Sequence, residues 1–368
     1  MDIRVLDHPL DRKDLAAFAG PGVYLFLPEK KKKVTDKILC VPDLLRFLRE
    51  EIEVCYVGKA KRLNQRLQSY RVASASSSGD WYKRGKLSEI AKSVLVVQTP
   101  SHFEACLLEL LLIRLLDPTL NYMSTRPGKL FYVQQSLNSN ELCAASRRRA
   151  GFKTWGCVRV KSELRLAFDA FQEIIDFYDP NSGTMKIRPA DSGFGRAGGV
   201  RRLSLRMSEK HLLWVQNVLR GKKQGLMDSL WREMRLAASQ QQFHYAAHLR
   251  DLFLALRQLQ VQLRRSRKIM RHLRANRFVI GCSDSGLERE YVLRQYTLIE
   301  LALKPGCLNS DSASFAELMR LAIDLFKSEM TGLSQSERLR VNFEFLRLML
   351  WWLEHQPEEC LTRSARNI

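Results

Sequence analysis

The sequence predicts an α+β protein made of several segments. Short apolar runs bounded by glycine, at 20–27 and 52–58, are typical of strands in a small sheet. Apolar residues at helical spacing cover much of 209–275, and a further strand pair is predicted at 278–301. With 368 residues and 45% hydrophobic content, the chain is long enough for two or three domains with their own cores.

The net charge is strongly positive. Lys and Arg number 60 against 39 Asp and Glu, which gives +21 and predicts a polyanionic partner. A basic soluble protein without such a partner is the alternative. The eight cysteines are scattered without a C-x-x-C pair, which argues against structural zinc. The N-terminus is charged and no apolar stretch reaches the length of a membrane span, so we expect a cytoplasmic protein with reduced thiols and no membrane contact.

The first hundred residues combine two strands with helices. The runs GPGVYLFL at 20–27 and IEVCYVG at 52–58 are expected to pair as a hairpin, with a basic and partly helical excursion between them at 28–53. The segment KRLNQRLQSY at 61–70 places leucines on one helical face and arginines, including Arg66, on the neighbouring face. It therefore predicts an amphipathic helix.

A buried helix is expected next. After a strand at 94–97, Ser101 and Glu104 form an S-x-x-E capping box that opens a nearly apolar helix ending before Pro118. Glu109 lies in the middle of this helix. A buried carboxylate needs a cation or strong hydrogen bonds to stay charged, so we expect such a partner for Glu109.

The remaining chain is mixed and then helical. We expect a helix at 162–178, a helical hairpin or one long helix within 209–275, and a β-hairpin that turns at 284–286. Four segments follow from this pattern. They are 1–125, 126–208, 209–277 and 278–368.

Several residue types occur in an order that matches a known family. The run GVY ends in Tyr24 and the run YVGK begins at Tyr56, and both resemble the signature halves of the GIY-YIG nuclease family. The resemblance covers 20–122 and implies a small three-stranded antiparallel sheet flanked by helices. The residues that carry it are Tyr24, Tyr56, Lys59, Arg66, Tyr70, Glu109 and Asn121.

The resemblance implies metal-dependent hydrolysis of a phosphodiester bond. Glu109 corresponds to the acid that holds a single Mg²⁺ or Mn²⁺ ion in this family, and Arg66 would bind the scissile phosphate bidentately. Either Tyr24 or Tyr56 would deprotonate the attacking water. Free tyrosine has a pKa near 10, so a base at pH 7 needs cationic neighbours such as Lys59 and Arg66.

The other residues are expected to support these. Tyr70 would assist within the site, and Asn121 would fix the backbone nearby. Gly58 would let the chain turn tightly, so that the Tyr56 hydroxyl and the Lys59 ammonium face one phosphate.

The resemblance narrows to UvrC/Cho-like endonucleases. GKAKRLNQRLQSY and EACLLELLLIRLLDPTLNY look like the nuclease half of UvrC, and 226–260 contains a stretch similar to the UVR motif, through which UvrC binds UvrB. The implied partners are damaged double-stranded DNA and UvrB, with UvrA acting upstream. The residues that carry the UVR likeness are Met234, Ala237, Ala238, Phe243, Ala246, Ala247, Leu249, Arg250 and Asp251.

The sequence also departs from that family. The stretch AFQEIIDFYDP at 170–180 has no cysteine where UvrC carries its cluster, so no iron–sulfur cluster is expected. His244 replaces the usual acidic residue of the UVR motif. Nothing after 278 resembles the second nuclease or the DNA-binding hairpins of UvrC. The resemblance therefore implies only the 3′ incision of nucleotide excision repair.

Two other functions remain open at this point. One is a nuclease that acts on branched or foreign DNA outside excision repair, and the other is a non-catalytic adaptor for DNA or UvrB. The basic run at 263–277 is either a surface for phosphates or a solvated helix face. The arginines at 147–149 add charge without a pattern that reads bases, which predicts sequence-independent and salt-dependent binding.

Overall fold

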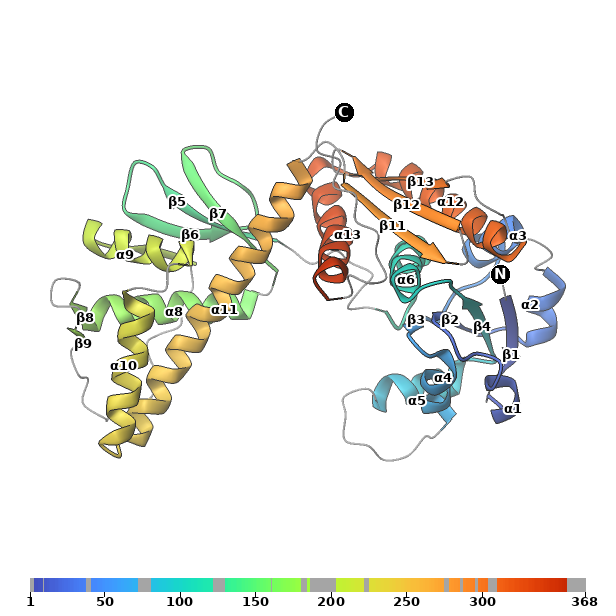
Figure 1. Cartoon of the computed structure of the whole chain (residues 1–368), viewed down its shortest axis with the longest axis horizontal. Coiled ribbons are helices and arrows are strands. Elements are labelled where there is room, and N and C mark those ends of the chain that lie inside the picture. The colour runs from blue at the N-terminus through green and yellow to red at the C-terminus, as the bar shows by residue number, and fades with distance from the viewer. Residues whose placement is uncertain are drawn as a thin grey trace. The chain divides into compact units, whose positions relative to one another are not determined.

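The computed structural model divides into two compact units, Met1–Pro127 with His272–Ile368, and Gly128–Arg271 (Figure 1). We call them unit 1 and unit 2. Among the described residues, none of the helices has the length and apolar content needed to cross a membrane. The described residues are 3–8, 10–37, 41–71, 81–121, 130–159, 161–179, 184–185, 203–221, 225–274, 278–284, 287–294, 297–303 and 310–355.

The N-terminal part of unit 1 is an α+β domain. Its strands are β1 (Ile3–Asp7), β2 (Gly22–Leu27), β3 (Tyr56–Ala60) and β4 (Ser93–Gln98). Its helices are α1 (Arg12–Leu15), α2 (Lys31–Lys37), α3 (Val41–Arg46), the π-helical turn η1 (Phe47–Glu51), α4 (Leu63–Arg71), α5 (Trp81–Ile90) and α6 (His102–Leu116).

The sheet has four antiparallel strands in the order β1-β4-β2-β3, where three were predicted. The additional strand is β1, which pairs along its whole length with β4. β2 and β3 form the expected hairpin, although β3 begins at Tyr56 rather than ending near it. Because β3 is the last strand in this order, it forms one edge of the sheet.

The two faces of this sheet have different helices. Apolar side chains from α1, α4 and α5 form a core with Tyr24, Phe26 and Tyr56 on one face. The other face packs against α6, which contacts β2 and β3. As predicted, α6 begins at a Ser101 cap, and it ends at Asp117 in the left-handed conformation (φ 42°).

The C-terminal part of unit 1 is a three-stranded sheet with two helices. The strands β11 (Phe278–Asp284), β12 (Leu287–Arg294) and β13 (Thr297–Leu303) pair in that order, which confirms the hairpin predicted around 284–286 and adds a strand. Helices α12 (Ser310–Thr331) and α13 (Gln335–His355) follow. α12 contacts α3, α6 and β13, and α13 contacts α6, so this part belongs to the same compact unit as the N-terminal domain.

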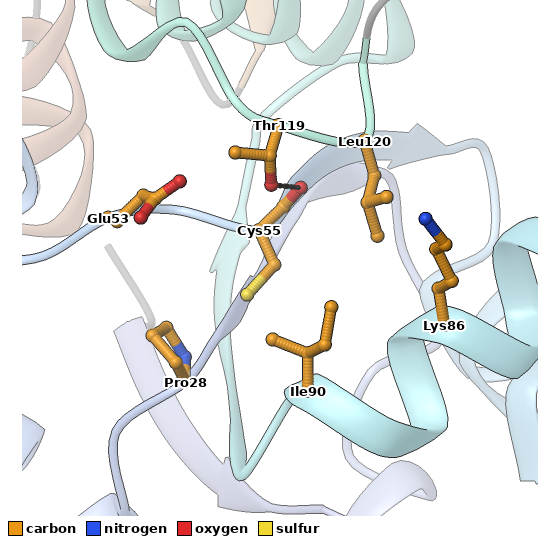
Figure 2. Close-up of a pocket in the computed structure, with 7 residues that line it drawn as sticks. All are labelled: Pro28, Glu53, Cys55, Lys86, Ile90, Thr119 and Leu120. Atoms are coloured by element: carbon orange, nitrogen blue, oxygen red, sulfur yellow. Dashed lines mark hydrogen bonds between the residues drawn. The ribbon is translucent and has the colours of Figure 1, made fainter.

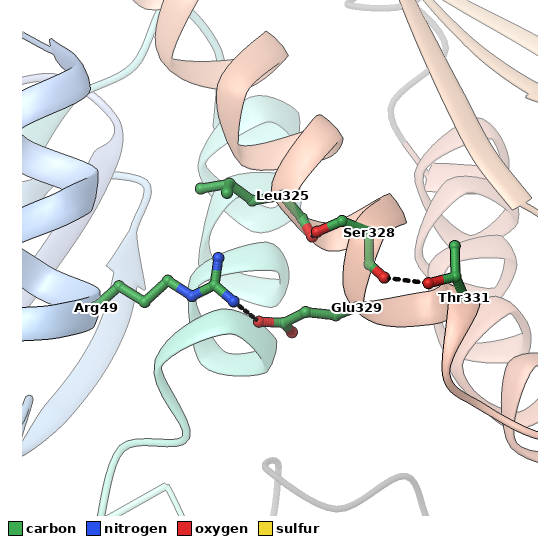
Figure 3. A network of polar contacts seen from close by, with 5 residues as sticks. All are labelled: Arg49, Leu325, Ser328, Glu329 and Thr331. Atoms are coloured by element: carbon green, nitrogen blue, oxygen red, sulfur yellow. Dashed lines mark hydrogen bonds and ion pairs between the residues drawn. The ribbon is translucent and has the colours of Figure 1, made fainter.

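Polar contacts join these two parts of unit 1. The Tyr291 hydroxyl donates to the Glu104 carboxylate at 2.6 Å, and Glu104 is fully buried. Arg114 on α6 forms an ion pair with Glu344 on α13. Arg49 forms a more exposed ion pair with Glu329 on α12 at 2.8 Å (Figure 3).

Unit 2 contains a second antiparallel sheet and a helical hairpin. The main sheet has the order β10-β6-β5-β7 and packs its apolar face on α8, α9, α10 and α11. A turn at 240–242 separates α10 from α11, so the predicted helical region is a hairpin. The elements are β5 (Phe131–Ser136), β6 (Glu141–Ala145), β7 (Phe152–Val158), α8 (Lys161–Phe177), β8 (Tyr178–Asp179), β9 (Thr184–Met185), β10 (Ser204–Arg206), α9 (Glu209–Arg220), α10 (Leu226–Ser239) and α11 (Phe243–Arg274), the last of which crosses the unit boundary.

Candidate active site

Three tyrosines form a cluster on the α4 side of the first sheet. Tyr24 lies on β2, Tyr56 on β3 and Tyr70 on α4, and all three are buried. The hydroxyls of Tyr24 and Tyr70 are 3.0 Å apart, and the Tyr24 and Tyr56 ring centroids are 6.2 Å apart. Three of the predicted site residues are thus brought together from three separate elements.

Arg66 joins this tyrosine cluster from one turn before Tyr70 on α4. Its Nε donates to the Tyr24 hydroxyl at 3.1 Å, and a terminal nitrogen donates to the Tyr70 hydroxyl at 3.2 Å. Its guanidinium also lies over the Tyr70 ring, 5.2 Å from the centroid. These two hydrogen bonds use two of the five N–H groups that a guanidinium carries.

The tyrosine pKa values are raised rather than lowered. Burial raises the pKa of Tyr24 to about 12, with a further contribution from Tyr56, and this outweighs the opposing effect of Arg66. Burial also raises the pKa of Tyr56, ahead of the effects of Tyr70 and Glu109. Arg66 lowers the pKa of both tyrosines, as expected of a cationic neighbour, but in the free protein its effect is smaller than that of burial. Both hydroxyls keep their protons at neutral pH.

This raised pKa predicts a stability change at alkaline pH. The unfolded chain loses the Tyr24 proton near pH 10 and the folded chain near pH 12, so the contribution of Tyr24 is complete below pH 10 and is lost as pH rises to 12. Two pKa units correspond to about 2–3 kcal/mol. We expect the free energy of unfolding of Tyr24→Phe to fall less steeply between pH 10 and 12 than that of wild type, as measured by urea denaturation. Equal slopes would contradict this burial argument.

Gly58 makes room for the Tyr24 ring. The two residues are cross-strand partners, and a Cβ atom added at Gly58 would lie 2.5 Å from both Cζ and the hydroxyl oxygen of Tyr24. Gly58 lies within β3 and is not among the residues with positive φ. The prediction that Gly58 forms a tight turn is therefore wrong, because it is the close approach of a ring that requires glycine here.

Gly58→Ala should consequently disturb the tyrosine cluster. The added methyl overlaps the Tyr24 ring, so the variant should lose about 1–3 kcal/mol of stability and displace the Tyr24 hydroxyl from Arg66. Thermal denaturation and a DNA cleavage assay measure the two effects. Gly85→Ala on α5 is the matched control, because its Cβ meets open space and alanine favours a helix. The argument fails if both variants behave alike.

Lys59 and Glu109 form an ion pair on the other side of β3. Lys59 Nζ lies 2.7 Å from Glu109 Oε2, which provides the cation that the sequence predicts for this carboxylate. Burial is the largest single effect and opposes the charge on Lys59, but Glu109 and Cys106 together outweigh it and raise the pKa of the ammonium. Strand alternation directs Lys59 and Tyr56 to opposite faces of the sheet. That the Tyr56 hydroxyl and the Lys59 ammonium meet one phosphate stays a prediction.

The Lys59–Glu109 pair and the tyrosine cluster still affect each other electrostatically, through Tyr56. Glu109 is among the charges that raise the pKa of Tyr56, and Arg66 is among those that lower it. Tyr56 therefore interacts electrostatically with both Arg66 and Glu109. Since β3 is an edge strand, both groups flank one edge of the sheet.

Sequence reasoning missed two neighbours of this ion pair. Cys106 is close enough that Lys59 and Glu109 affect its pKa, which burial raises. The Cys106 sulfur lies 3.8 Å from His102 Nε2. The spacing of His102, Cys106 and Glu109 at i, i+4 and i+7 on one helix is the signal that predicts their shared face.

Glu109 fits a metal site that depends on one carboxylate. Mg²⁺ is commonly held by one or two carboxylates while water and substrate phosphates complete its shell. The Glu109 side chain is 19% exposed, and its carboxylate already forms an ion pair with a cation, the Lys59 ammonium. Within the described residues, His, Cys, Asp and Glu form no group of three or more that could hold a metal. An ion here would therefore take its other ligands from DNA and water.

Asn121 fixes the edge of β3. Its side-chain oxygen accepts from the Val57 N–H at 2.8 Å, and its amide nitrogen donates to the Val57 carbonyl at 2.9 Å. The side chain thus takes the place of a neighbouring strand at the middle of β3. This contact holds the segment that carries both Tyr56 and Lys59.

A pocket of about 390 Å³ lies elsewhere in the N-terminal domain (Figure 2). Its lining contains none of the candidate catalytic residues. At one wall, the Thr119 hydroxyl donates to the Cys55 carbonyl at 3.4 Å. The lining residues are Pro28, Glu53, Cys55, Lys86, Ile90, Thr119 and Leu120.

In the basic run at 263–277, one arginine holds the helix in place and others are exposed to solvent. Arg267 donates to the carbonyls of Leu219 and Trp155 and so holds α11 to unit 2. Arg264 and Arg265 are exposed on α11. Residues 275–277 lie outside the described residues.

Comparison with known proteins finds one matching domain model and several similar proteins of one name. A model of the UvrC-like GIY-YIG domain matches residues 42–122, which include every predicted site residue except Tyr24. UvrABC system protein C of Legionella pneumophila (strain Lens) is 28% identical over 245 residues, covering 61% of this chain and 37% of that protein. The Carboxydothermus hydrogenoformans protein of the same name is 26% identical over 280 residues, covering 74% and 44%.

The match is partial in length. The chain spans less than half of these relatives, and the Clostridium kluyveri protein, 27% identical over 218 residues, is covered to 34%. No solved structure matches. The chain thus carries a UvrC-like GIY-YIG domain and is related to UvrABC system protein C.

Proposed function

We propose that this protein is a metal-dependent endodeoxyribonuclease of nucleotide excision repair that cuts on the 3′ side of a lesion marked by UvrB. The observation that carries the proposal is the arrangement of Arg66 and the tyrosine cluster beside the Lys59–Glu109 pair within a UvrC-like GIY-YIG domain. The residue types that phosphodiester hydrolysis requires lie on β2, β3, α4 and α6 of this domain.

Arg66 and the tyrosine hydroxyls bind the scissile phosphate in this proposal. Arg66 retains N–H groups beyond those bonded to Tyr24 and Tyr70, and its orientation is fixed by those bonds. Because the tyrosines keep their protons at neutral pH, a hydroxyl that is not donating to another tyrosine of the cluster can donate to a phosphate oxygen. Fixed donors stabilise the charge that develops on phosphate in the transition state.

The choice of base stays between Tyr24 and Tyr56. Either hydroxyl can take a proton from water only if substrate binding lowers its pKa from the raised value of the free protein. Glu109 would hold Mg²⁺ or Mn²⁺, which supplies Lewis-acid stabilisation of the phosphate. Lys59 is paired with Glu109 in the free protein, and in this proposal its ammonium also contacts the phosphate.

The helical hairpin is the proposed contact with UvrB. Leu236 and Phe243 flank its turn and are 50% and 67% exposed, although both are large and apolar. Ala237, Ala246 and Leu249 are buried between the helices, as expected of a hairpin core. Exposed apolar side chains on both sides of a turn fit a protein partner. We therefore place UvrB at this end of the hairpin.

Incision of end-labelled duplex DNA tests the proposal. The substrate carries one bulky adduct, and the reaction contains UvrA, UvrB, ATP and Mg²⁺. We expect a single nick on the 3′ side of the adduct that requires UvrB. Cutting of undamaged branched DNA without UvrB would instead support a nuclease of another pathway. Binding without any nick would support a non-catalytic adaptor.

A further inference from the structure

We infer that the loop at 146–151 of unit 2 binds the phosphodiester backbone of DNA through Arg147, Arg148 and Arg149. We call this segment the arginine loop. It joins β6 to β7, and all three arginines are exposed. The inference rests on the proposed action on DNA and adds a second, non-catalytic contact surface outside unit 1.

A buried glutamine fixes the backbone of the arginine loop. Gln134 on β5 is fully buried, its amide nitrogen donates to the Arg147 carbonyl at 2.9 Å, and its oxygen accepts from the Arg149 N–H at 2.7 Å. Gly151 closes the loop with φ 73°, and its carbonyl accepts from Leu137 N–H at 2.9 Å. The loop is thus held on both sides by the sheet beneath it.

Aromatic rings hold two of the arginine side chains. The Arg148 guanidinium lies 5.3 Å from the Tyr132 ring centroid, and that of Arg149 lies 5.7 Å from the Phe152 centroid. Arg149 also lies 3.9 Å from the Cys143 sulfur. A guanidinium held by a ring keeps its N–H groups for a planar anion such as phosphate. Less side-chain entropy is then lost on binding.

The described part of unit 2 places no paired carboxylate beside the arginine loop. Among the described residues, no carboxylate forms an ion pair with Arg147, Arg148 or Arg149. Glu141 at the start of β6 is instead bonded to the Ser204 hydroxyl at 2.6 Å. Three adjacent exposed cations on a fixed loop fit a polyanion, in agreement with the net charge of +21.

DNA backbone is the ligand that this chemistry favours. The arginine loop is a short connection between two strands and not a helix or β-ribbon that could enter the major groove, so its guanidinium groups should contact phosphates rather than base edges. Each cation that neutralises a phosphate adds about 0.9 to the negative slope of log K against log salt concentration. The arginine loop should therefore contribute a measurable part of that slope.

The test measures DNA binding separately from cleavage. Glu109→Gln serves as the parent of all variants, and a short fluorescent duplex is titrated at several salt concentrations with a chelator present. Replacing Arg147, Arg148 and Arg149 by glutamine should weaken binding about tenfold or more and reduce the slope by about 3. The matched control replaces Arg165, Arg232 and Arg235, which are exposed on α8 and α10 of the same unit, and should leave the slope unchanged.

Three results would overturn the inference. One is an equal loss of affinity in the loop and control variants, which would show only an effect of total charge. A second is unchanged binding by the loop variant, or no binding of duplex by the parent. A third is a loop-dependent affinity for RNA duplex that exceeds the affinity for DNA. None of these depends on cleavage, so the proposed nuclease function is tested independently by the incision assay.

Discussion

Glu109→Gln should reduce DNA incision about 1,000-fold or more while leaving DNA binding intact. Glu109 is the proposed ligand of the divalent ion, and the Lewis-acid contribution of such an ion amounts to several kcal/mol of transition-state stabilisation. Each 1.36 kcal/mol corresponds to a factor of ten in rate. Chelation of the metal should stop wild-type incision for the same reason. The rate is measured as the appearance of the 3′ nick under single-turnover conditions.

Two controls separate this effect from misfolding. Glu89→Gln removes an exposed carboxylate from α5 of the same domain and should cut like wild type. Urea denaturation of Glu109→Gln reports how much stability depends on the Lys59 pair, which is partly exposed and so should contribute less than about 1 kcal/mol. A variant that folds normally and still cuts within about tenfold of the wild-type rate would remove Glu109 from the site.

Local signals were sufficient to predict β2, α4 and α6 of the N-terminal domain. The spacing of Arg66 and Tyr70 at i and i+4 places both on one face of α4, and the structure bonds them to Tyr24. The capping residue Ser101 fixed the start of α6. Such features depend on neighbours within one turn or one hairpin, which a sequence pattern contains directly.

Contacts between distant segments could not be predicted in this way. β1 is a strand of only five residues that carries Arg4 and Asp7 among apolar side chains, and its pairing with β4 is visible only in the folded sheet. The role of Gly58 depends on a ring that approaches from β2 rather than on its own backbone. The tyrosine pKa values were predicted from the charges nearby, whereas burial dominates, and burial depends on the packing of the whole domain.

The sequence also did not predict that the C-terminal part of unit 1 contacts the nuclease domain. Its sequence suggests no function, yet it provides the partners of two charged groups on α6, the helix that carries Glu109. Arg114 is almost fully buried, and its ion-pair partner Glu344 comes from α13. Removing one member of a buried ion pair leaves an uncompensated charge in a medium of low dielectric constant, which costs about 3–5 kcal/mol. The C-terminal part is therefore expected to stabilise the nuclease domain.

Glu344→Gln should accordingly lower the free energy of unfolding of unit 1 by about 3 kcal/mol or more, as measured by urea denaturation. Glu329→Gln is the matched control, because it breaks the Arg49 ion pair between the same two parts of the chain. That pair is about one-third exposed on each side, so water and salt screen it and its loss should cost less than about 1 kcal/mol. If the free energy of unfolding falls equally in the two variants, burial does not determine how much the two ion pairs contribute to stability. A large loss confined to Glu344→Gln would show that α6, and with it Glu109, depends on the C-terminal part for its position.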